Sequence, residues 1–166
     1  MTFKLQAKRE AAKSALKQFH NLYPQTFLIC GTLLGAIREG DLIHHDRDLD
    51  LGCFALPPAK EDDRFKPYKT FHYQGQESER AVIHKRGEVK IDLFVFFEED
   101  ESCYYAIYPD EFPERPTIIR RFPKFHLKPL KIWDHTFFVP NNPKQWLEIN
   151  YGPDWRIPNP KFKYQP

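Results

Sequence analysis

The chain has 166 residues, of which 41% are apolar and 16% aromatic, and its formal net charge at pH 7 is +2. This length and composition suit one folded domain and exclude an intrinsically disordered chain. The small net charge gives no reason to infer nucleic-acid binding, and no apolar run near Met1 indicates a signal peptide or a transmembrane segment.

The first third of the chain predicts helix, strand, helix and strand in turn. Apolar residues at helical spacing predict a helix over about residues 4–22, which ends before Pro24. A short apolar run predicts a strand over 26–30, and residues 33–38 have room for one or two turns of helix. A strand with alternating side chains follows over 48–54.

The remainder of the chain is rich in strands. Strand-like runs occur at 68–73, 81–85, 89–97, 103–108, 117–122 and 135–139. A last helix begins at Asn142-Pro143 and ends before Gly152-Pro153. Because strands and helices do not alternate regularly, the order predicts an α+β fold in a single compact domain over residues 1–166, with its core motifs within 26–156.

Cysteines and tryptophans are interpreted as packing residues. The three cysteines are widely spaced, which predicts neither a zinc cage nor a disulfide framework and favours a cytoplasmic location. No Cys–His pairing is suggested, so Cys30 and Cys53 are interpreted as small core residues. Trp146 and Trp155 are expected to pack the last helix against the sheet rather than to stack on a base.

Three aspartates occupy alternate positions in the strand predicted over 48–54 and just before it. If this segment is extended, Asp46, Asp48 and Asp50 all point to one face. Carboxylates crowded in this way repel one another, and a divalent cation removes that cost. The spacing excludes an EF-hand loop, and oxygen ligands without a Cys or His pattern favour Mg²⁺ or Mn²⁺.

Two further features point to phosphate chemistry. Gly31-Thr32 stands between a strand and a helix, where free N–H groups favour an anion. Asp92 lies within the apolar run 89–97, where a carboxylate must either face a polar site or be buried unpaired at a cost of several kcal/mol. We therefore expect Asp92 to join Asp48 and Asp50, as a metal ligand or as the base that accepts a hydroxyl proton.

Two residues near this group have alternative interpretations. Arg38 either pairs with a donor phosphate or pairs with Glu39, Asp41 or another carboxylate and holds the loop. Asp46 either supports the metal ligands or accepts an N–H in the turn. His44 and His45 precede the aspartates but face different directions, so they are not expected to bind the metal, although one of them is expected to line the pocket.

Four segments of the chain, in this order, resemble those of the LicD/fukutin-related family of the nucleotidyltransferase superfamily. They are GTLLGAIREGDLI from residue 31, HDRDLDLG from 45, KIDLF from 90 and VPNNPKQWLEINYGPDW from 139. Two departures stand out. The chain has His44-His45-Asp46 where the family has Pro-Trp-Asp, and only 41 residues run from Leu51 to Ile91, so an acceptor-binding subdomain is expected to be missing.

The resemblance implies a nucleotidyltransferase-like mixed β-sheet flanked by helices, with Mg²⁺ or Mn²⁺ on Asp48, Asp50 and Asp92. It implies that Gly31 and Thr32 contact the donor phosphates. It also implies transfer of a phospho-alcohol, such as phosphocholine or ribitol phosphate, from a CDP-activated donor to a sugar hydroxyl of a glycan, with CMP as the leaving group.

Three other functions remain open on the sequence. The first is nucleotidyl transfer from an NTP to a protein or small molecule, marked by pyrophosphate release. The second is a metal-dependent glycosyltransferase that uses Asp48-Leu49-Asp50 as its DxD motif, which would leave Gly31-Thr32 and Asp92 unexplained. The third is a degenerate nucleotide-binding module, which the retention of all three acids disfavours.

Overall fold

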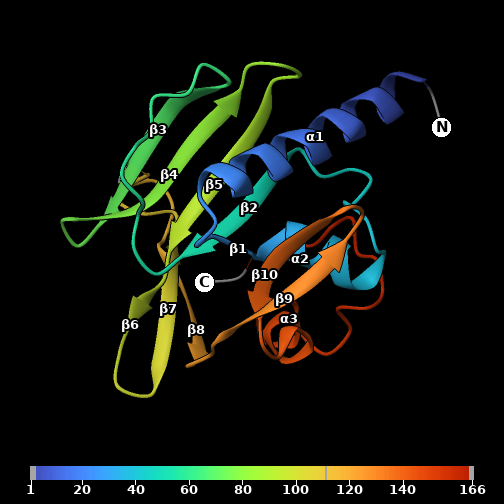
Figure 1. Cartoon of the computed structure of the whole chain (residues 1–166). Helices are drawn as coiled ribbons and strands as arrows, with labels where there is room; N and C mark the ends of the chain where they lie inside the picture. Colours follow the sequence, from blue (N-terminus) through green and yellow to red (C-terminus); the bar gives the residue numbers. More distant parts are fainter. Residues whose placement is uncertain (1–2, 111, 165–166) are drawn as a thin grey trace.

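A seven-stranded mixed sheet carries most of the chain (Figure 1). The computed structural model describes residues 3–110 and 112–164, and the side chains of the first helix from residue 6 onward. Its helices are α1 (Phe3–Leu22), α2 (Cys30–Arg38) and α3 (Pro143–Tyr151). Its strands are β1 (Phe27–Leu28), β2 (Asp48–Cys53), β3 (Phe65–Tyr73), β4 (Gln76–His84), β5 (Val89–Val95), β6 (Phe97–Glu98), β7 (Ser102–Ile107), β8 (Ile118–Pro123), β9 (Leu127–Ile132) and β10 (His135–Pro140). The predicted α+β class is confirmed.

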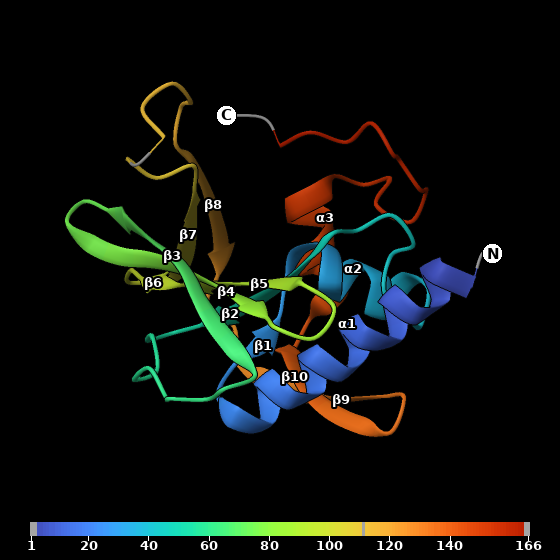
Figure 2. The same cartoon turned by 90° about the horizontal axis from the view of Figure 1, so that it is seen from above.

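The large sheet has the strand order β3-β4-β5-β2-β1-β10-β9, and β6-β7-β8 form a second, smaller sheet. Within the large sheet β2 runs parallel to β5 and β1 runs parallel to β10, whereas the other neighbours are antiparallel. Figure 2 shows α1 on one face of the large sheet and α2 and α3 on the other. The expected mixed sheet flanked by helices is therefore present.

The core forms because α1 and β2 each bury one side. Leu16 and Phe19 of α1 are buried, as the helical spacing predicts, and Leu49 and Leu51 of β2 are buried on the face opposite the aspartates. Each such side chain contributes about 1.5–3 kcal/mol to folding. No helix within the described residues is long and apolar enough to cross a bilayer.

The chain turns from strand to helix earlier than the sequence indicates. The strand predicted over 26–30 is confined to Phe27–Leu28, and α2 begins at Cys30 rather than at Leu33. Cys30 adopts a left-handed backbone conformation, with φ of 45°, which a side chain disfavours. A residue pattern does not reveal such a conformation, so the sequence predicts a later start for this helix than the structure has.

The β3–β4 hairpin is longer than predicted. The strands predicted over 68–73 and 81–85 begin at Phe65 and at Gln76. Gln74 and Gly75 join them with positive φ values of 50° and 76°, the geometry of tight hairpin turns whose twist matches that of the strands. Both strands contain many exposed polar side chains, so the apolar runs in the sequence predict only part of their length.

Two further predictions were wrong in detail. The single strand predicted over 89–97 is interrupted at Phe96, where the chain passes from the large sheet to β6 of the small one. Strand β9 was not predicted because it contains Pro129, which cannot donate a backbone hydrogen bond. A strand at the edge of a sheet tolerates such a residue, and β9 is an edge strand of the large sheet. The other edge strand, β3, contains Pro67 beside an irregularity in its pairing with β4.

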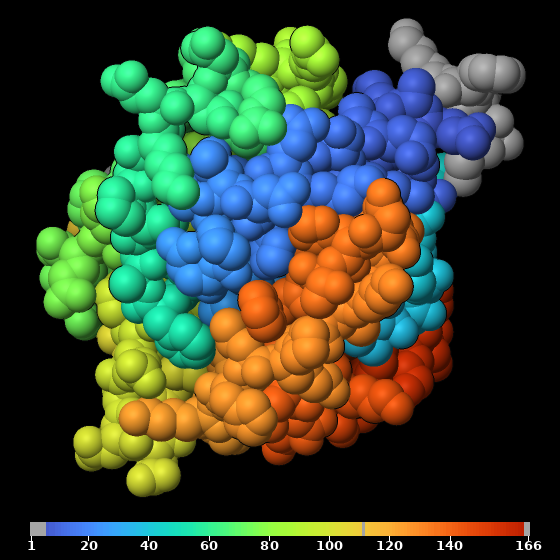
Figure 3. Space-filling model, in the orientation of Figure 1, coloured from blue at the N-terminus to red at the C-terminus, as the bar shows by residue number. Residues whose placement is uncertain are grey.

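The hairpin of β9 and β10 packs against the end of α1 (Figure 3), where the blue and orange surfaces meet. At this junction His20 Nδ1 lies 3.0 Å from His135 Nε2, and Lys17 Nζ lies 2.9 Å from Asp134 Oδ1. Burial, reinforced by the neighbouring His135, lowers the pKa of His20 to about 4. The fold therefore contains a histidine that is neutral in the folded state.

Acidification is expected to destabilise this junction. Since the pKa of His20 is depressed on folding, the unfolded chain takes up the proton first, and stability falls as the pH drops from about 6.5 towards 4. The contribution is at most about 3 kcal/mol. Urea denaturation at several pH values should show a shallower acid loss for His20→Phe than for the wild type. The exposed His126→Gln is the control and should keep the wild-type slope; an equal slope in all three proteins would contradict the prediction.

Candidate active site

The parallel pairing of β2 and β5 brings the predicted acids together. Its register sets Asp50 opposite Asp92 and Asp48 opposite Lys90. Residues paired across neighbouring strands point to the same face of a sheet. Asp92 therefore shares a face with Asp48 and Asp50, although the two strands are separated by about a quarter of the chain, and this face is the one that α2 covers.

The start of α2 is bound to β2 by two hydrogen bonds. The Gly31 N–H donates to Asp50 Oδ2 at 3.2 Å, and the Asp50 N–H donates to Thr32 Oγ1 at 2.8 Å. Thr32 is buried, and its hydroxyl oxygen is used as the acceptor for the backbone of β2. Gly31 and Thr32 therefore position the aspartates directly, and the predicted contact of both residues with donor phosphates stays a prediction.

Gly31 packs closely against the side chains of the aspartates. A Cβ atom at this position would collide with Asp46 Oδ2 and lie 3.6 Å from Asp50 Oδ2. The backbone of α2 thus approaches the carboxylates as closely as a chain without a side chain permits. Asp46, for its part, accepts the N–H of Arg47 at 3.2 Å and so takes the turn-forming role that was one of its two interpretations.

The carboxylates on this face resist ionisation. Burial, together with the charges of Asp48, Asp92 and Asp46, raises the pKa of Asp50 well above its usual range. Burial against its neighbours and the charge of Asp48 raise the pKa of Asp46 to about 6, even though part of that side chain is open to a cavity. This face consequently favours binding of a cation, which would relieve the repulsion.

A further acid, Glu79 of β4, lies beside Asp92. It is 8% exposed, and burial followed by the charge of Asp92 raises its pKa to about 8. Burial also raises the pKa of Asp92, although Lys90 Nζ lies 2.7 Å from Asp92 Oδ2. Asp92 Oδ1 is buried with no hydrogen-bond partner, an unsatisfied state that is uncommon in a folded protein.

The oxygen atoms on this face suit a hard divalent cation, and the unpartnered Asp92 oxygen has a lone pair to offer. Within residues 3–110 and 112–164, however, no three His, Cys, Asp or Glu side chains are already grouped as a metal site. Asp48, Asp50 and Asp92 would thus have to adjust their side chains to share an ion. Lys90 compensates part of the negative charge of Asp92.

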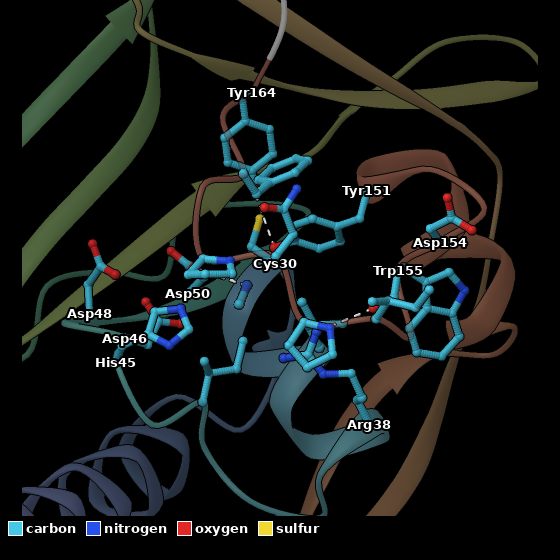
Figure 4. A pocket seen from close by; sticks show the side chains of 18 of the residues that line it. Cys30, Arg38, His45, Asp46, Asp48, Asp50, Tyr151, Asp154, Trp155 and Tyr164 are labelled. Carbon is cyan, nitrogen blue, oxygen red and sulfur yellow. Dashed lines mark hydrogen bonds between the residues drawn. The ribbon is translucent and has the colours of Figure 1, made fainter.

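The aspartates form one end of a cavity of about 660 Å³. Figure 4 shows Asp46, Asp48, Asp50 and His45 on one side of it and Arg38 and Trp155 on the other, with Tyr151 and Tyr164 between them. Ligand pockets for small molecules have volumes of this order, an apolar lining and a few polar groups. The cavity therefore has the size and chemistry of a ligand site that ends at the carboxylates.

A hydrogen-bonded chain of buried and half-buried side chains forms the wall of this cavity. Tyr105 Oη donates to Asn150 Oδ1 at 3.0 Å, and Asn150 Nδ2 donates to Tyr164 Oη at 3.3 Å. Tyr164 Oη also lies 3.2 Å from Tyr151 Oη. The segment that follows α3 is thereby attached to the helix and to the small sheet. It presents the rings of Phe162 and Tyr164 to the cavity, beside Tyr151 of α3.

Arg38 lines the cavity and also holds the surrounding chain. Its Nη2 lies 2.7 Å from Glu39 Oε1 and its Nη1 donates to the Trp155 carbonyl at 3.3 Å, whereas its Nε is buried without a partner. The pairing with Glu39 agrees with one of the two interpretations. Asp41 pairs instead with Arg9 and Lys13.

The residues interpreted as packing groups lie mostly in the core. Trp146 is 3% exposed and stacks on Phe122, with 4.5 Å between ring centroids, as expected. Trp155 is buried too, but it borders the cavity. Cys30, Cys53 and Cys103 are free and buried, and burial raises the pKa of the Cys30 thiol well above its usual range, which disfavours a thiolate nucleophile.

Sequence reasoning missed Glu79 and the tyrosines of the cavity. Glu79 lies two residues before Ala81 on the same face of β4, and the Gln74-Gly75 turn was the signal that would have extended the predicted strand to include it. Tyr105, Tyr151 and Tyr164 come from three separate elements. No local pattern could have predicted that they meet.

Two glycine substitutions should distinguish a clash with a side chain that can rotate from a clash with the backbone. Gly31→Ala meets only the end of the Asp46 side chain, which can rotate, so the free energy of unfolding should change by no more than about 1 kcal/mol. Gly35→Ala meets the Asp41 carbonyl oxygen at 2.5 Å and the Ile43 nitrogen at 2.9 Å and should cost about 1–3 kcal/mol. Urea denaturation measures both; a greater loss for Gly31→Ala would contradict this reading of the contact.

Curated relatives match three quarters or more of this chain. A ribitol-5-phosphate transferase FKTN of Macaca fascicularis is 29% identical over 164 residues, which cover 95% of this chain and 35% of the relative. Ribitol 5-phosphate transferase FKRP of Homo sapiens is 28% identical over 177 residues, covering 95% and 33%. An uncharacterised protein of Rickettsia typhi is 28% identical over 125 residues, covering 75% and 38%.

This chain spans about a third of the length of the curated relatives it matches. The family described as "LicD/FKTN/FKRP, nucleotidyltransferase domain" matches residues 24–142. That range includes the start of α2, the aspartates of β2 and Asp92 of β5. The resemblance seen in the four sequence segments is confirmed, and the chain belongs to the LicD/FKTN/FKRP nucleotidyltransferase-domain family.

Proposed function

We propose that this chain is a metal-dependent phosphotransferase that moves a phospho-alcohol group, of the ribitol-phosphate or phosphocholine type, from a CDP-activated donor to a sugar hydroxyl of a glycan. The observation that carries the proposal is the placement of Asp50 and Asp92 side by side, with the Gly31 N–H on Asp50. The printed names of the FKTN and FKRP relatives, ribitol-phosphate transferases, support the type of group transferred.

Asp48, Asp50 and Asp92 would hold Mg²⁺ or Mn²⁺. Their hard oxygen atoms fit such an ion, and Asp92 Oδ1 lacks any other partner. The ion would neutralise charge on the phosphate oxygens during transfer. The protein would supply the rigid support, because the two hydrogen bonds to α2 fix the backbone and one carboxylate oxygen of Asp50.

In the transfer step, the acceptor oxygen forms a bond to the phosphorus that carries the alcohol. The bond between that phosphorus and the bridging oxygen of the diphosphate breaks, and CMP leaves with the bridging oxygen and its electron pair. The acceptor hydroxyl proton goes to a carboxylate. Asp92 is our candidate for this base, since it lies beside Asp50 on the same face of the sheet.

The cavity beside the aspartates is our candidate for the donor nucleotide. Its volume of about 660 Å³ suits a nucleotide, and its aromatic wall offers faces on which a pyrimidine ring can stack. The diphosphate would then lie at the carboxylate end, near the start of α2. Arg38, at the other end, has one nitrogen without a partner.

Removal of either central acid is expected to abolish turnover. With CDP-ribitol, Mg²⁺ and an acceptor glycan, CMP release should fall about 100-fold or more in Asp50→Asn and in Asp92→Asn, because each variant loses a charged ligand or base. The free energy of unfolding should stay the same or rise, since one of several repelling charges is gone.

The exposed Asp100→Asn is the matched control and should turn over at the wild-type rate. Normal turnover in either active-site variant would remove that residue from the mechanism. Pyrophosphate release from CTP, with no reaction of CDP-ribitol, would instead favour nucleotidyl transfer and overturn the proposal.

The aromatic wall should be needed for nucleotide binding. Tyr164→Ala removes a ring from the cavity and should reduce the rise in melting temperature caused by CDP with Mg²⁺, whereas Tyr164→Phe keeps the ring and should retain most of that rise. Tyr68→Ala, at a residue that is 61% exposed, is the control. An unchanged CDP effect in Tyr164→Ala would place the base elsewhere.

A further inference from the structure

One side of the cavity beside the aspartates is formed by residues 153–164, which follow α3 and belong to no helix or strand (Figure 2). In the middle of this segment Ile157, Pro158, Asn159 and Pro160 line the cavity, yet all four are exposed. Ile157 is a large apolar residue, and it is 66% exposed. The segment therefore faces the cavity on one side and solvent on the other.

The backbone of this segment is hydrogen-bonded to itself and to the end of α3. Within the part of the chain that the structure describes, its backbone bonds run from the N–H groups of Trp155, Ile157 and Phe162 to the carbonyls of Gly152, Asp154 and Asn159. A segment that shares no backbone–backbone hydrogen bonds with a sheet or a neighbouring helix separates from the fold at a low free-energy cost. Side chains therefore decide how firmly residues 153–164 are held.

The beginning of the segment is fixed by Trp155. Its side chain is 5% exposed, and its carbonyl accepts a hydrogen bond from Arg38 Nη1 at 3.3 Å. An indole ring buries more apolar surface than most side chains do. This end is therefore expected to stay in place when the remainder of the segment moves.

The other end of the segment is held by Tyr164. Its hydroxyl accepts a hydrogen bond from Asn150 Nδ2 at 3.3 Å and lies 3.2 Å from Tyr151 Oη. Its ring lies beside those of Tyr151 and Phe162. Tyr164 is only half-buried, so water is available to replace these bonds. The attachment at Tyr164 is thus the weaker of the two.

Asn150 is oriented for this contact by the small sheet. It is 4% exposed, and its Oδ1 accepts a hydrogen bond from Tyr105 Oη at 3.0 Å. With the carbonyl oxygen of the amide used in this way, the amide nitrogen is turned towards Tyr164. Asn150 therefore offers a fixed donor to a tyrosine that is itself free to move away.

Two prolines stiffen the part of the segment between Trp155 and Tyr164. Pro158 and Pro160 each fix one backbone angle, which limits the conformations open to the residues around them. Residues 156–164 are therefore expected to move together about the Trp155 end rather than to coil freely.

A nucleotide bound as proposed above lies against this segment, and CMP must leave the cavity after each transfer. We propose that residues 156–164 form a lid on the cavity and that the lid detaches at Tyr164 to let the nucleotide enter and leave. Asn150 is the positioning residue that holds the lid closed. This inference rests on the proposed function, because it takes a nucleotide as the ligand that the lid covers.

Trypsin cleavage measures how often the lid detaches when no ligand is present. Lys161 and Lys163 lie in the lid beside Tyr164, and a protease cleaves mainly the transiently opened chain. Tyr164→Phe, which removes only the hydroxyl, should be cleaved after these lysines about threefold faster or more, the effect of a lost hydrogen bond. Asn150→Ala should act in the same direction, and mass spectrometry identifies the bonds that are cut.

Tyr73→Phe is the matched control. It removes a hydroxyl that accepts a hydrogen bond from Gln74 Nε2 at 3.3 Å in another part of the chain, and the lid should be cleaved as in the wild type. Urea denaturation should give the same free energy of unfolding for Tyr164→Phe and the wild type, which assigns the faster cleavage to the lid. Saturating CDP with Mg²⁺ should slow cleavage after Lys161 and Lys163 in every variant.

The rate constants of CDP binding distinguish a lid from a simple contact. Stopped-flow fluorescence with CDP and Mg²⁺ uses Trp155, which borders the cavity. Tyr164→Phe should raise the association and dissociation rate constants together, by about threefold or more, and leave Kd within about twofold of the wild-type value. A hydroxyl that only contacted the nucleotide would change the dissociation rate constant alone.

Three outcomes would overturn the lid. They are equal cleavage of Tyr164→Phe and the wild type, an unchanged association rate constant in this variant, and bound CDP that does not slow cleavage. The proposed function fails separately, if neither CDP nor CMP binds or if CDP-ribitol releases no CMP with any acceptor. Faster cleavage of Tyr164→Phe in that case would show a lid over a cavity whose ligand is not a cytidine nucleotide.

Discussion

The exchange of hydrogen bonds between Asp50 and the start of α2 is the constraint on which the candidate site depends. Asp50 uses its N–H on Thr32 and receives the Gly31 N–H on its carboxylate, so backbone and side chain are held at once. The same bonds fix where α2 begins. All other site groups take their positions from this junction, because β5 is paired with β2 and α3 packs beside α2.

This junction stabilises an arrangement that is costly by itself. Asp46, Asp48, Asp50 and Asp92 share one face, and burial, together with the charges of neighbouring carboxylates, raises the pKa of Asp46, Asp50 and Asp92. The opposite face of β2 offsets that cost with Leu49 and Leu51, which are buried in the core. Because side chains alternate along β2, the leucines on one face pack in the core and stabilise the fold. The aspartates on the other face remain available for chemistry.

The sequence was sufficient for the parts of the structure that depend on local pattern. Period-two spacing predicted the aspartate face, helical spacing predicted α1, and Asn142-Pro143 predicted the start of α3. It could not predict the register of β2 against β5, which is set by long-range packing. It also missed β9, since Pro129 is tolerated only at an edge, and the meeting of Tyr105, Tyr151 and Tyr164, which depends on three distant elements.

The two edges of the large sheet have a consequence for association with other chains. An exposed edge strand offers unpaired N–H and C=O groups to which another strand can add. Here one edge contains Pro67 next to an irregularity in its pairing, and the other contains Pro129 between Lys128 and Lys131. A proline lacks an N–H, and the lysines repel a like edge, so neither side offers an uninterrupted template. The sheet is protected from growing by strand addition and hence from aggregation along its edges.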